Sequence, residues 1–133
     1  MKDFFNELAN NVISDVMVSG YLDTETPPIF HPMYERIYFF ICDDIFEVYI
    51  NDGVIDFNIL ERIDKWFDLD DDDTFSLMSI YSQLFKTEQS VAIESIDYNN
   101  VPFSDMGINY SDGENKKLIH ICPNNFFGFT FYN

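Results

Sequence analysis

The stretch that decides the fold is Phe46-Glu47-Val48-Tyr49-Ile50-Asn51-Asp52-Gly53-Val54-Ile55-Asp56-Phe57. Two runs rich in β-branched and aromatic residues flank a central Asn-Asp-Gly turn sequence. An Asp-Gly pair between such runs is a strong short-range signal for a β-hairpin. We therefore predict two antiparallel strands joined by a tight turn at residues 51–53.

The residues before this hairpin fit two interpretations. An apolar stripe at three- and four-residue spacing would suit a helix, and its members are Tyr34, Ile37, Tyr38, Ile41, Ile45 and Val48. The consecutive residues Tyr38, Phe39 and Phe40, however, do not fit one helical face. We favour strands for residues 34–57.

Helices are predicted on either side of this region. Residues 3–19 carry an amphipathic stripe, with Gly20 as a stop, and the prolines of residues 20–33 indicate irregular structure. Further helices are expected over residues 58–68, capped by Asn58, and over residues 74–86.

The last third predicts antiparallel sheet. Strands are expected at 91–96, 108–110, 117–122 and 126–132, with a hairpin loop at 111–116 and a turn at 123–125. No linker or repeat divides the chain. The predicted fold is therefore α+β: one domain over residues 1–133, with amphipathic helices packed on a mainly antiparallel β-sheet.

Charge is the most unusual property of the composition. The 133 residues contain 24 acids and 7 bases, which gives a net charge of −17. Such a field repels nucleic acid and anionic membranes and attracts basic proteins. We therefore expect no direct binding of nucleic acid and no membrane association. The N-terminus lacks the basic and apolar regions of a secretory signal, so we expect a cytoplasmic protein.

Half of the acids lie between residues 43 and 73, where only Arg62 and Lys65 oppose them. A run of like charge is often just a solvated loop, but concentrating charge costs repulsion that scattering would avoid. Trp66 lies within this segment and is of the residue type that anchors interfaces. The predicted partner-binding residues are Asp43, Asp44, Glu47, Asp52, Asp56, Glu61, Asp64, Trp66, Asp68, Asp70, Asp71, Asp72 and Asp73.

Calcium is a chemical alternative for the acid run. Asp68, Asp70 and Asp72 match the first three ligand positions of an EF-hand loop. The glycine and the final glutamate of that loop are replaced by Asp73 and Ser79. A dedicated EF-hand is therefore not expected, although weak binding of divalent cations stays open.

Zinc and nucleophilic catalysis depend on four residues: His31, Cys42, His120 and Cys122. They form no CxxC or HxxxH motif, and two reduced, buried thiols are the simpler expectation. The chain also lacks the GxSxG, Walker A and GxGxxG motifs. We therefore expect no metal, no cofactor and no enzyme activity, although a small enzyme without a recognisable motif stays open.

Size, acidity and the lack of catalytic motifs together favour an inhibitor that binds a basic protein. In these respects the chain resembles the immunity proteins that protect bacteria from the nuclease domains of secreted polymorphic or contact-dependent toxins. This resemblance is one of composition and assigns no residues. A nucleic-acid mimic that blocks a defence nuclease is the first alternative. Homodimerisation through residues 126–132 is a further prediction, because an uncovered strand edge invites pairing.

Overall fold

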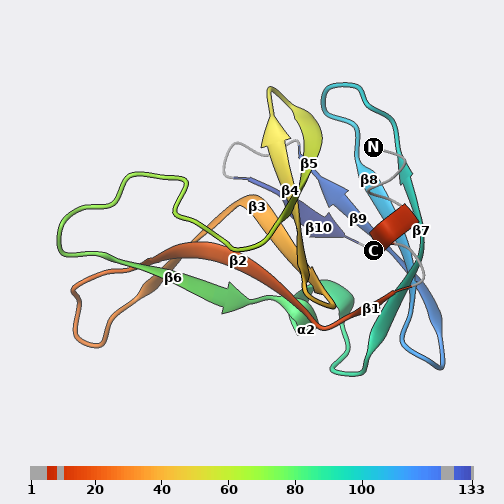
Figure 1. Cartoon of the computed structure of the whole chain (residues 1–133), viewed down its shortest axis with the longest axis horizontal. Helices are drawn as coiled ribbons and strands as arrows, with labels where there is room; N and C mark the ends of the chain where they lie inside the picture. The colour runs from red at the N-terminus through yellow and green to blue at the C-terminus, as the bar shows by residue number, and fades with distance from the viewer. Residues whose placement is uncertain (1–5, 9–10, 124–127, 133) are drawn as a thin grey trace.

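Two five-stranded antiparallel sheets form the structure, which is a computed structural model that describes residues 6–8, 11–123 and 128–132 (Figure 1). Sheet A has the order β1 (Val12–Ile13), β7 (Val91–Tyr98), β8 (Met106–Ser111), β9 (Lys116–Cys122) and β10 (Thr130–Tyr132). Sheet B has the order β5 (Val54–Leu60), β4 (Asp44–Asn51), β3 (Phe30–Ile41), β2 (Asp15–Leu22) and β6 (Thr74–Ser79).

The predicted α+β class is wrong. Strands account for 56% of the structure and helices for 7%, and no described helix has seven or more residues. Helix α2 (Tyr81–Phe85) is a single short segment, and residues 6–8 are also helical. No described helix is long and apolar enough to cross a membrane.

The three predicted amphipathic helices are replaced mainly by strands. Residues 3–5 and 9–10 of the first lie outside the described residues, and most of its remainder belongs to β1 and β2. The four-residue spacing that suggested a helix is also a multiple of the two-residue period of a strand. Val16 and Val18 accordingly both point into the core. The second helix is replaced by the end of β5 and a loop, and the third by β6 followed by α2.

The central hairpin is confirmed. Asn51 pairs with Val54 across the turn, so β4 and β5 are joined by two residues. Asp52 and Gly53 both have positive φ, at 51° and 79°. That combination is typical of the type I′ turn, whose twist matches the twist of paired strands.

The predicted C-terminal sheet is also confirmed where it is described. Strands β7, β8 and β9 form a continuous antiparallel meander, and residues 112–115 form the loop between β8 and β9. Of the last predicted strand, 126–132, residues 128–132 are described, and Thr130–Tyr132 form β10, which pairs with β9. Residues 124–127, which include most of the predicted turn, lie outside the described residues.

One hydrophobic core lies between the two sheets. Sheet B contributes alternate residues of its strands, among them Ile37, Phe39 and Ile41 of β3. Sheet A contributes a facing set, and α2 adds Leu84 and Phe85. The hydroxyl group of Tyr110 donates a hydrogen bond of 2.8 Å to the carbonyl oxygen of Phe85, which fixes α2 to sheet A.

Sheet B extends beyond the core as a projecting arm (Figure 1). The arm begins where the pairing of β2 with β3 shifts register, between Met17 and Ser19. On the core side of this shift β3 pairs with both β2 and β4. On the far side β3 pairs with β2 alone, and the other edge of β2 pairs with β6. We call residues 19–33 and 61–77 the acidic arm.

Candidate functional site: the acidic arm

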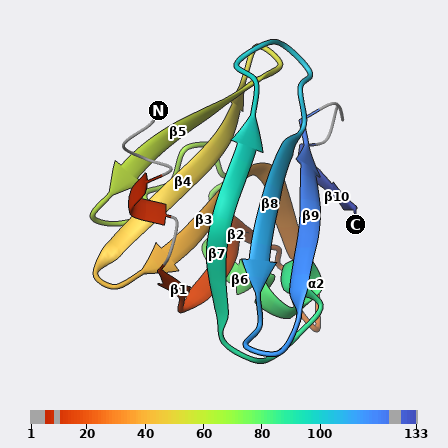
Figure 2. The ribbon, with the colours of Figure 1, turned by 90° about the vertical axis from the view of Figure 1, so that its right-hand side faces the viewer.

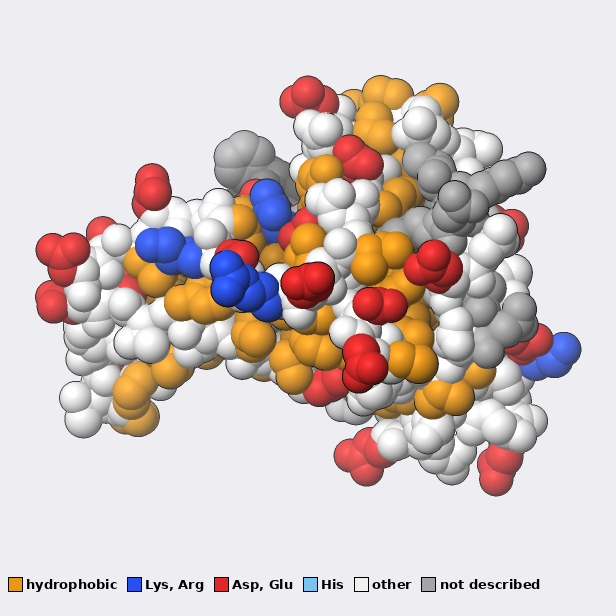
Figure 3. Space-filling view, viewed as in Figure 1, with side chains coloured by type: hydrophobic (Ala, Val, Ile, Leu, Met, Phe, Trp, Pro, Cys, Tyr) orange, Lys and Arg blue, Asp and Glu red, His pale blue; other side chains and the backbone are white. Residues whose placement is uncertain are grey.

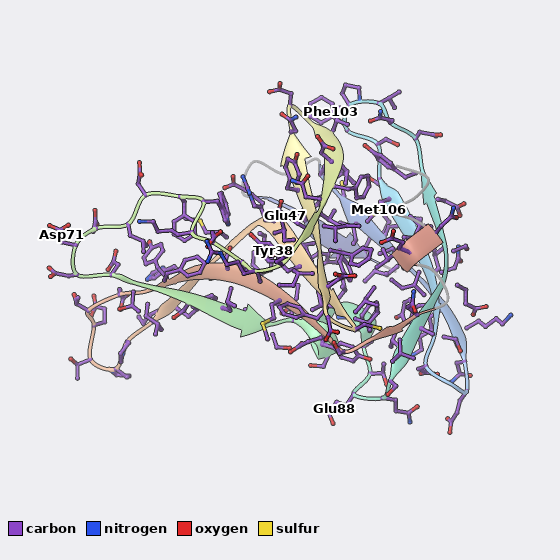
Figure 4. The ribbon with its side chains drawn as sticks, viewed as in Figure 1. Tyr38, Glu47, Asp71, Glu88, Phe103 and Met106 are labelled. Atoms are coloured by element: carbon purple, nitrogen blue, oxygen red, sulfur yellow. The ribbon has the colours of Figure 1, made fainter. Side chains whose placement is uncertain are left out.

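The acidic arm carries nine acids and two bases, Arg62 and Lys65. In Figure 4 its outer end is marked by Asp71, which lies far from the core. Asp70, Asp71 and Asp72 are all exposed in the loop between β5 and β6. Figure 3 shows acidic side chains at this outer end and basic side chains nearer to the body of the molecule. The arm therefore presents concentrated negative charge on a narrow projection.

Two acids of the arm were missed by the sequence analysis. Strand pairing places Leu22 opposite Thr74, so the turn between β2 and β3 lies beside the acid run that precedes Thr74. This turn contains Asp23 and the exposed Glu25. They are about fifty positions away from the acid run in the sequence, and only the pairing of β2 with β6 brings the two segments together.

Asp23 organises the turn at the end of the arm. Its Oδ1 atom accepts hydrogen bonds of 3.0 Å from the backbone N–H groups of Glu25 and Ile29. Its Oδ2 atom lies 2.7 Å from Nε2 of His31. The Ile29 hydrogen bond, followed by that of His31, lowers the pKa of the Asp23 carboxyl below its usual value. The acid is therefore used to hold the turn in shape.

Trp66 fastens the loop between β5 and β6 to sheet B. Its Nε1–H group donates a hydrogen bond of 2.8 Å to the Ser19 hydroxyl. The guanidinium carbon of Arg36 lies 4.5 Å from the centre of the indole ring, a cation–π distance. Phe67 packs edge-on against Trp66, with ring centres 5.1 Å apart. The predicted interface anchor is thus half-buried and serves to attach the loop.

Glu47 is also part of this attachment. Its side chain is 4% exposed, and its Oε2 atom lies 3.2 Å from Nη1 of Arg36. Its Oε1 atom accepts a hydrogen bond of 3.1 Å from the Asn58 amide. Because a buried carboxylate requires such partners, Glu47 belongs to a polar network under the loop and is not available as a surface charge.

Tyr38 lies beside Glu47 on the same face of sheet B and is 1% exposed (Figure 4). Burial, with a further contribution from the Glu47 charge, raises the pKa of its hydroxyl to about 12. The run Tyr38-Phe39-Phe40 is therefore compatible with a strand, because Phe39 faces the core and Tyr38 is buried on the opposite face.

This shift predicts a loss of stability at high pH. The folded pKa lies above the unfolded value of about 10, so the neutral hydroxyl stabilises the fold fully below pH 10 and this contribution disappears as the pH rises through 12. Between pH 9 and pH 11 the free energy of unfolding should fall by about 1 kcal/mol more in the wild type than in Tyr38→Phe. Urea unfolding at the two pH values measures this difference. Equal losses in both proteins would contradict it.

The other predicted binding residues do not join the arm. Asp43 and Asp44 lie at the turn between β3 and β4, whereas Asp52 lies at the turn between β4 and β5, at the opposite end of the β4 strand. Asp56 lies on β5, paired with Tyr49. The arm itself contains Glu61, Asp64, Trp66, Asp68 and the run Asp70, Asp71, Asp72 and Asp73. The thirteen residues thus do not form one surface.

The alternatives based on metal chemistry have little geometric support. The acid run lies between strands β5 and β6, not between the helices that an EF-hand requires. Within residues 6–8, 11–123 and 128–132, no group of three or more His, Cys, Asp or Glu residues could hold a metal ion. The predicted burial of both thiols is wrong for Cys42, which is exposed.

Comparison with known proteins adds no relative. No family model matches the chain, and searches of curated proteins and of solved structures give no significant match. The functional argument therefore depends on the geometry of the molecule.

Proposed function

We propose that this chain is an acidic inhibitor that binds a basic protein, in the manner of an immunity protein that neutralises a nuclease-type toxin. The observation that carries the proposal is the acidic arm: a projection with nine acids and two bases, set on a chain with a net charge of −17. A nuclease binds phosphates in a positively charged cleft. A narrow acidic projection matches such a cleft in both shape and charge.

The attachment of the arm supports this proposal. A binding surface that is ordered before it meets its partner loses less conformational entropy on association. The contacts of Trp66 with Ser19 and Arg36, and of Arg36 with Glu47, hold the loop on sheet B. Asp23 holds the adjacent turn. The exposed acids therefore project from a loop and a turn that are both held in position by these contacts.

Charge on the arm should control how fast the complex forms. In the triple variant Asp70→Asn, Asp71→Asn, Asp72→Asn, association with a basic partner should be about tenfold slower at low salt, because these exposed acids steer the encounter. High salt should reduce the difference, because it screens exposed charges. Stopped-flow or surface-binding kinetics with the purified partner measures both effects.

The partner can be isolated by pull-down from a lysate of the source organism, with the wild type and the triple variant as baits at low and high salt. A matched control removes the same charge elsewhere, with Glu88→Gln, Glu94→Gln and Glu114→Gln, all exposed and outside the arm. Support would be a basic protein that the wild type and control bind, that the arm variant binds weakly, and whose nuclease activity the wild type inhibits. Capture of only acidic or neutral proteins, or equal binding by all three baits, would contradict the proposal.

The same experiment separates the toxin inhibitor from a nucleic-acid mimic. A mimic occupies the site for nucleic acid on a defence nuclease, so its partner would be a restriction-type or similar defence enzyme and not a secreted toxin domain. The identity of the captured nuclease therefore decides between these two kinds of inhibitor.

A further inference from the structure

A second feature with binding geometry lies on the outer face of sheet A, away from the acidic arm. This face is formed by β7, β8 and β9 and is turned toward the viewer in Figure 2. It holds a groove of about 810 Å³. That volume lies within the usual range for sites that bind small molecules or short peptide segments. We call this feature the sheet A groove.

The groove exists because Gly107 forms its floor. In the strand pairing Gly107 lies between Asp97 of β7 and His120 of β9, so a residue with no side chain is flanked on both sides by residues that have one. A Cβ atom at this position would lie 3.6–3.8 Å from the nearest side-chain atoms of Leu118 and His120, which is ordinary contact. Neither backbone strain nor crowding therefore explains a glycine here. The effect of the missing side chain is an open floor.

One wall of the groove is aromatic and fixed in position. The rings of His120 and Tyr132 are stacked, with centres 4.8 Å apart and an angle of 17° between their planes. The Tyr132 hydroxyl donates a hydrogen bond to the Asp105 carboxylate. On the other side, the Asn109 amide donates a hydrogen bond of 3.0 Å to the Ser95 hydroxyl and lies 3.5 Å from Oδ2 of Asp97.

The rim of the groove exposes apolar side chains, one of them in the loop between β7 and β8. Phe103 is 61% exposed, and Leu118 and Tyr132 are also among the exposed large hydrophobic residues. Phe103 has a φ of 64°, which is unfavourable for a residue with a side chain, and its N–H donates a hydrogen bond of 2.7 Å to the Gly53 carbonyl. The exposed Phe103 ring therefore adds apolar contact surface at the rim of the groove.

The groove is also negatively charged. Asp97 and Asp105 both line it, and among the described residues no lysine or arginine does. The nearest bases in the sequence are paired with other acids: Lys116 Nζ lies 3.5 Å from Glu94, and Lys117 Nζ lies 3.3 Å from Asp112. The groove thus combines two carboxylates with exposed aromatic rings, which is complementary to a planar cation.

We propose that the sheet A groove binds an arginine side chain presented by an exposed segment of another protein. A guanidinium group stacks on aromatic faces and forms paired hydrogen bonds with carboxylates, whereas a lysine ammonium is a compact and strongly hydrated charge. Phe103 and Tyr132 supply aromatic surface, and Asp97 and Asp105 supply carboxylate oxygens. This proposal does not depend on the function of the acidic arm.

The test uses short peptides with one cationic residue: acetyl-Gly-Ser-Arg-Ser-Gly-amide and its lysine and citrulline counterparts. Titration of the labelled whole chain, followed by NMR at physiological salt, locates the binding site and gives its affinity. The arginine peptide should shift the amide signals of residues 97–109 and 118–120. The lysine peptide should bind several-fold more weakly, and the uncharged citrulline peptide about tenfold more weakly or not at all.

Two variants test the groove. Gly107→Val fills the floor with a residue that favours strands, and Asp97→Asn removes one charge with little change in shape. Each should weaken arginine-peptide binding about tenfold. Glu114→Gln removes the same charge from the exposed loop between β8 and β9 and should leave binding unchanged. Circular dichroism confirms that each variant is folded.

Three outcomes would overturn the proposal. In the first, all three peptides bind equally. In the second, the shifted signals belong to the acid run Asp70 to Asp73. In the third, Gly107→Val binds the arginine peptide as tightly as the wild type. Any of these would show that the groove does not recognise a guanidinium group, whereas the pull-down with the arm variants tests the acidic arm separately.

Discussion

Gly20→Ala should unfold or detach the acidic arm. A Cβ atom at Gly20 would lie 2.2 Å from the carbonyl oxygen of His31 and 2.8 Å from the Phe30 ring. The first contact is with backbone in the paired strand, so β2 and β3 must move apart to relieve it. We expect a loss of about 3 kcal/mol in the free energy of unfolding, the upper range for overpacking a tight site. Urea unfolding followed by circular dichroism measures this loss.

The matched control for Gly20→Ala is Gly107→Ala, which adds the same methyl group to a strand where a Cβ atom would meet only ordinary contacts. Alanine is favoured over glycine within a strand, so this control should be unchanged or more stable by about 0.5–1 kcal/mol. Equal effects of the two substitutions would show that the close approach at Gly20 does not matter. Hydrogen exchange would further show whether the loss at Gly20 is confined to β2, β3 and β6.

Trp66→Ala should have the second largest effect. It removes the hydrogen bond to Ser19, the ring under Arg36 and the contact with Phe67. It also uncovers the salt bridge between Arg36 and Glu47. Because Trp66 is half-buried, we expect a loss of about 2–3 kcal/mol, below the range for a fully buried tryptophan. Urea unfolding again gives the value.

Trp66→Phe separates the contribution of the aromatic ring from that of the hydrogen bond to Ser19. It keeps an aromatic face for Arg36 but loses the Nε1–H donor to Ser19, so it should recover roughly half of the stability lost in Trp66→Ala. Binding of a basic partner should follow the same order: wild type, Trp66→Phe, Trp66→Ala. If Trp66→Ala binds as fast and as tightly as the wild type, then a fixed loop is not needed for recognition.

The sequence predicted the strands that local turn chemistry determines. Asn51-Asp52-Gly53 requires positive φ at two adjacent positions, so the hairpin of β4 and β5 could be placed from its own residues. The meander of β7, β8 and β9 was predictable for a similar reason, because alternating apolar residues and a polar loop define it locally.

The helices were mispredicted because the spacing of their apolar residues fits both a helix and a strand. Pairing with other strands decides between the two. Residues 15–22 lie between β3 and β6, so they are an inner strand of sheet B. The pairing partner β3 follows closely in the sequence, but β6 lies more than fifty positions away, and no local pattern reveals that pairing. The close approach of Gly20 to His31 has the same origin: the glycine, taken as the end of a helix, is a point where two strands touch.

The candidate site was predictable only in part. The concentration of acids near residues 64–73 was visible as composition, and these residues do project from the body. The contribution of Asp23 and Glu25 depends on the pairing of β2 with β6, which are more than fifty positions apart in the sequence, and no local pattern encodes that pairing. The burial of Glu47 and the groove over Gly107 lie within locally paired strands, but they depend on which side chains cover each face of the sheet, and a strand pattern alone does not show this.

Trp66 is the single tryptophan of the chain, so its fluorescence emission reports on the environment of one known position. The indole ring lies in the acidic arm, against the Arg36 guanidinium, and far from Gly107 in the floor of the sheet A groove. A ligand that binds the acidic arm should change the wavelength and quenching of tryptophan emission. An arginine peptide in the sheet A groove should leave the emission unchanged. Unlabelled protein can therefore report which of its two surfaces is occupied.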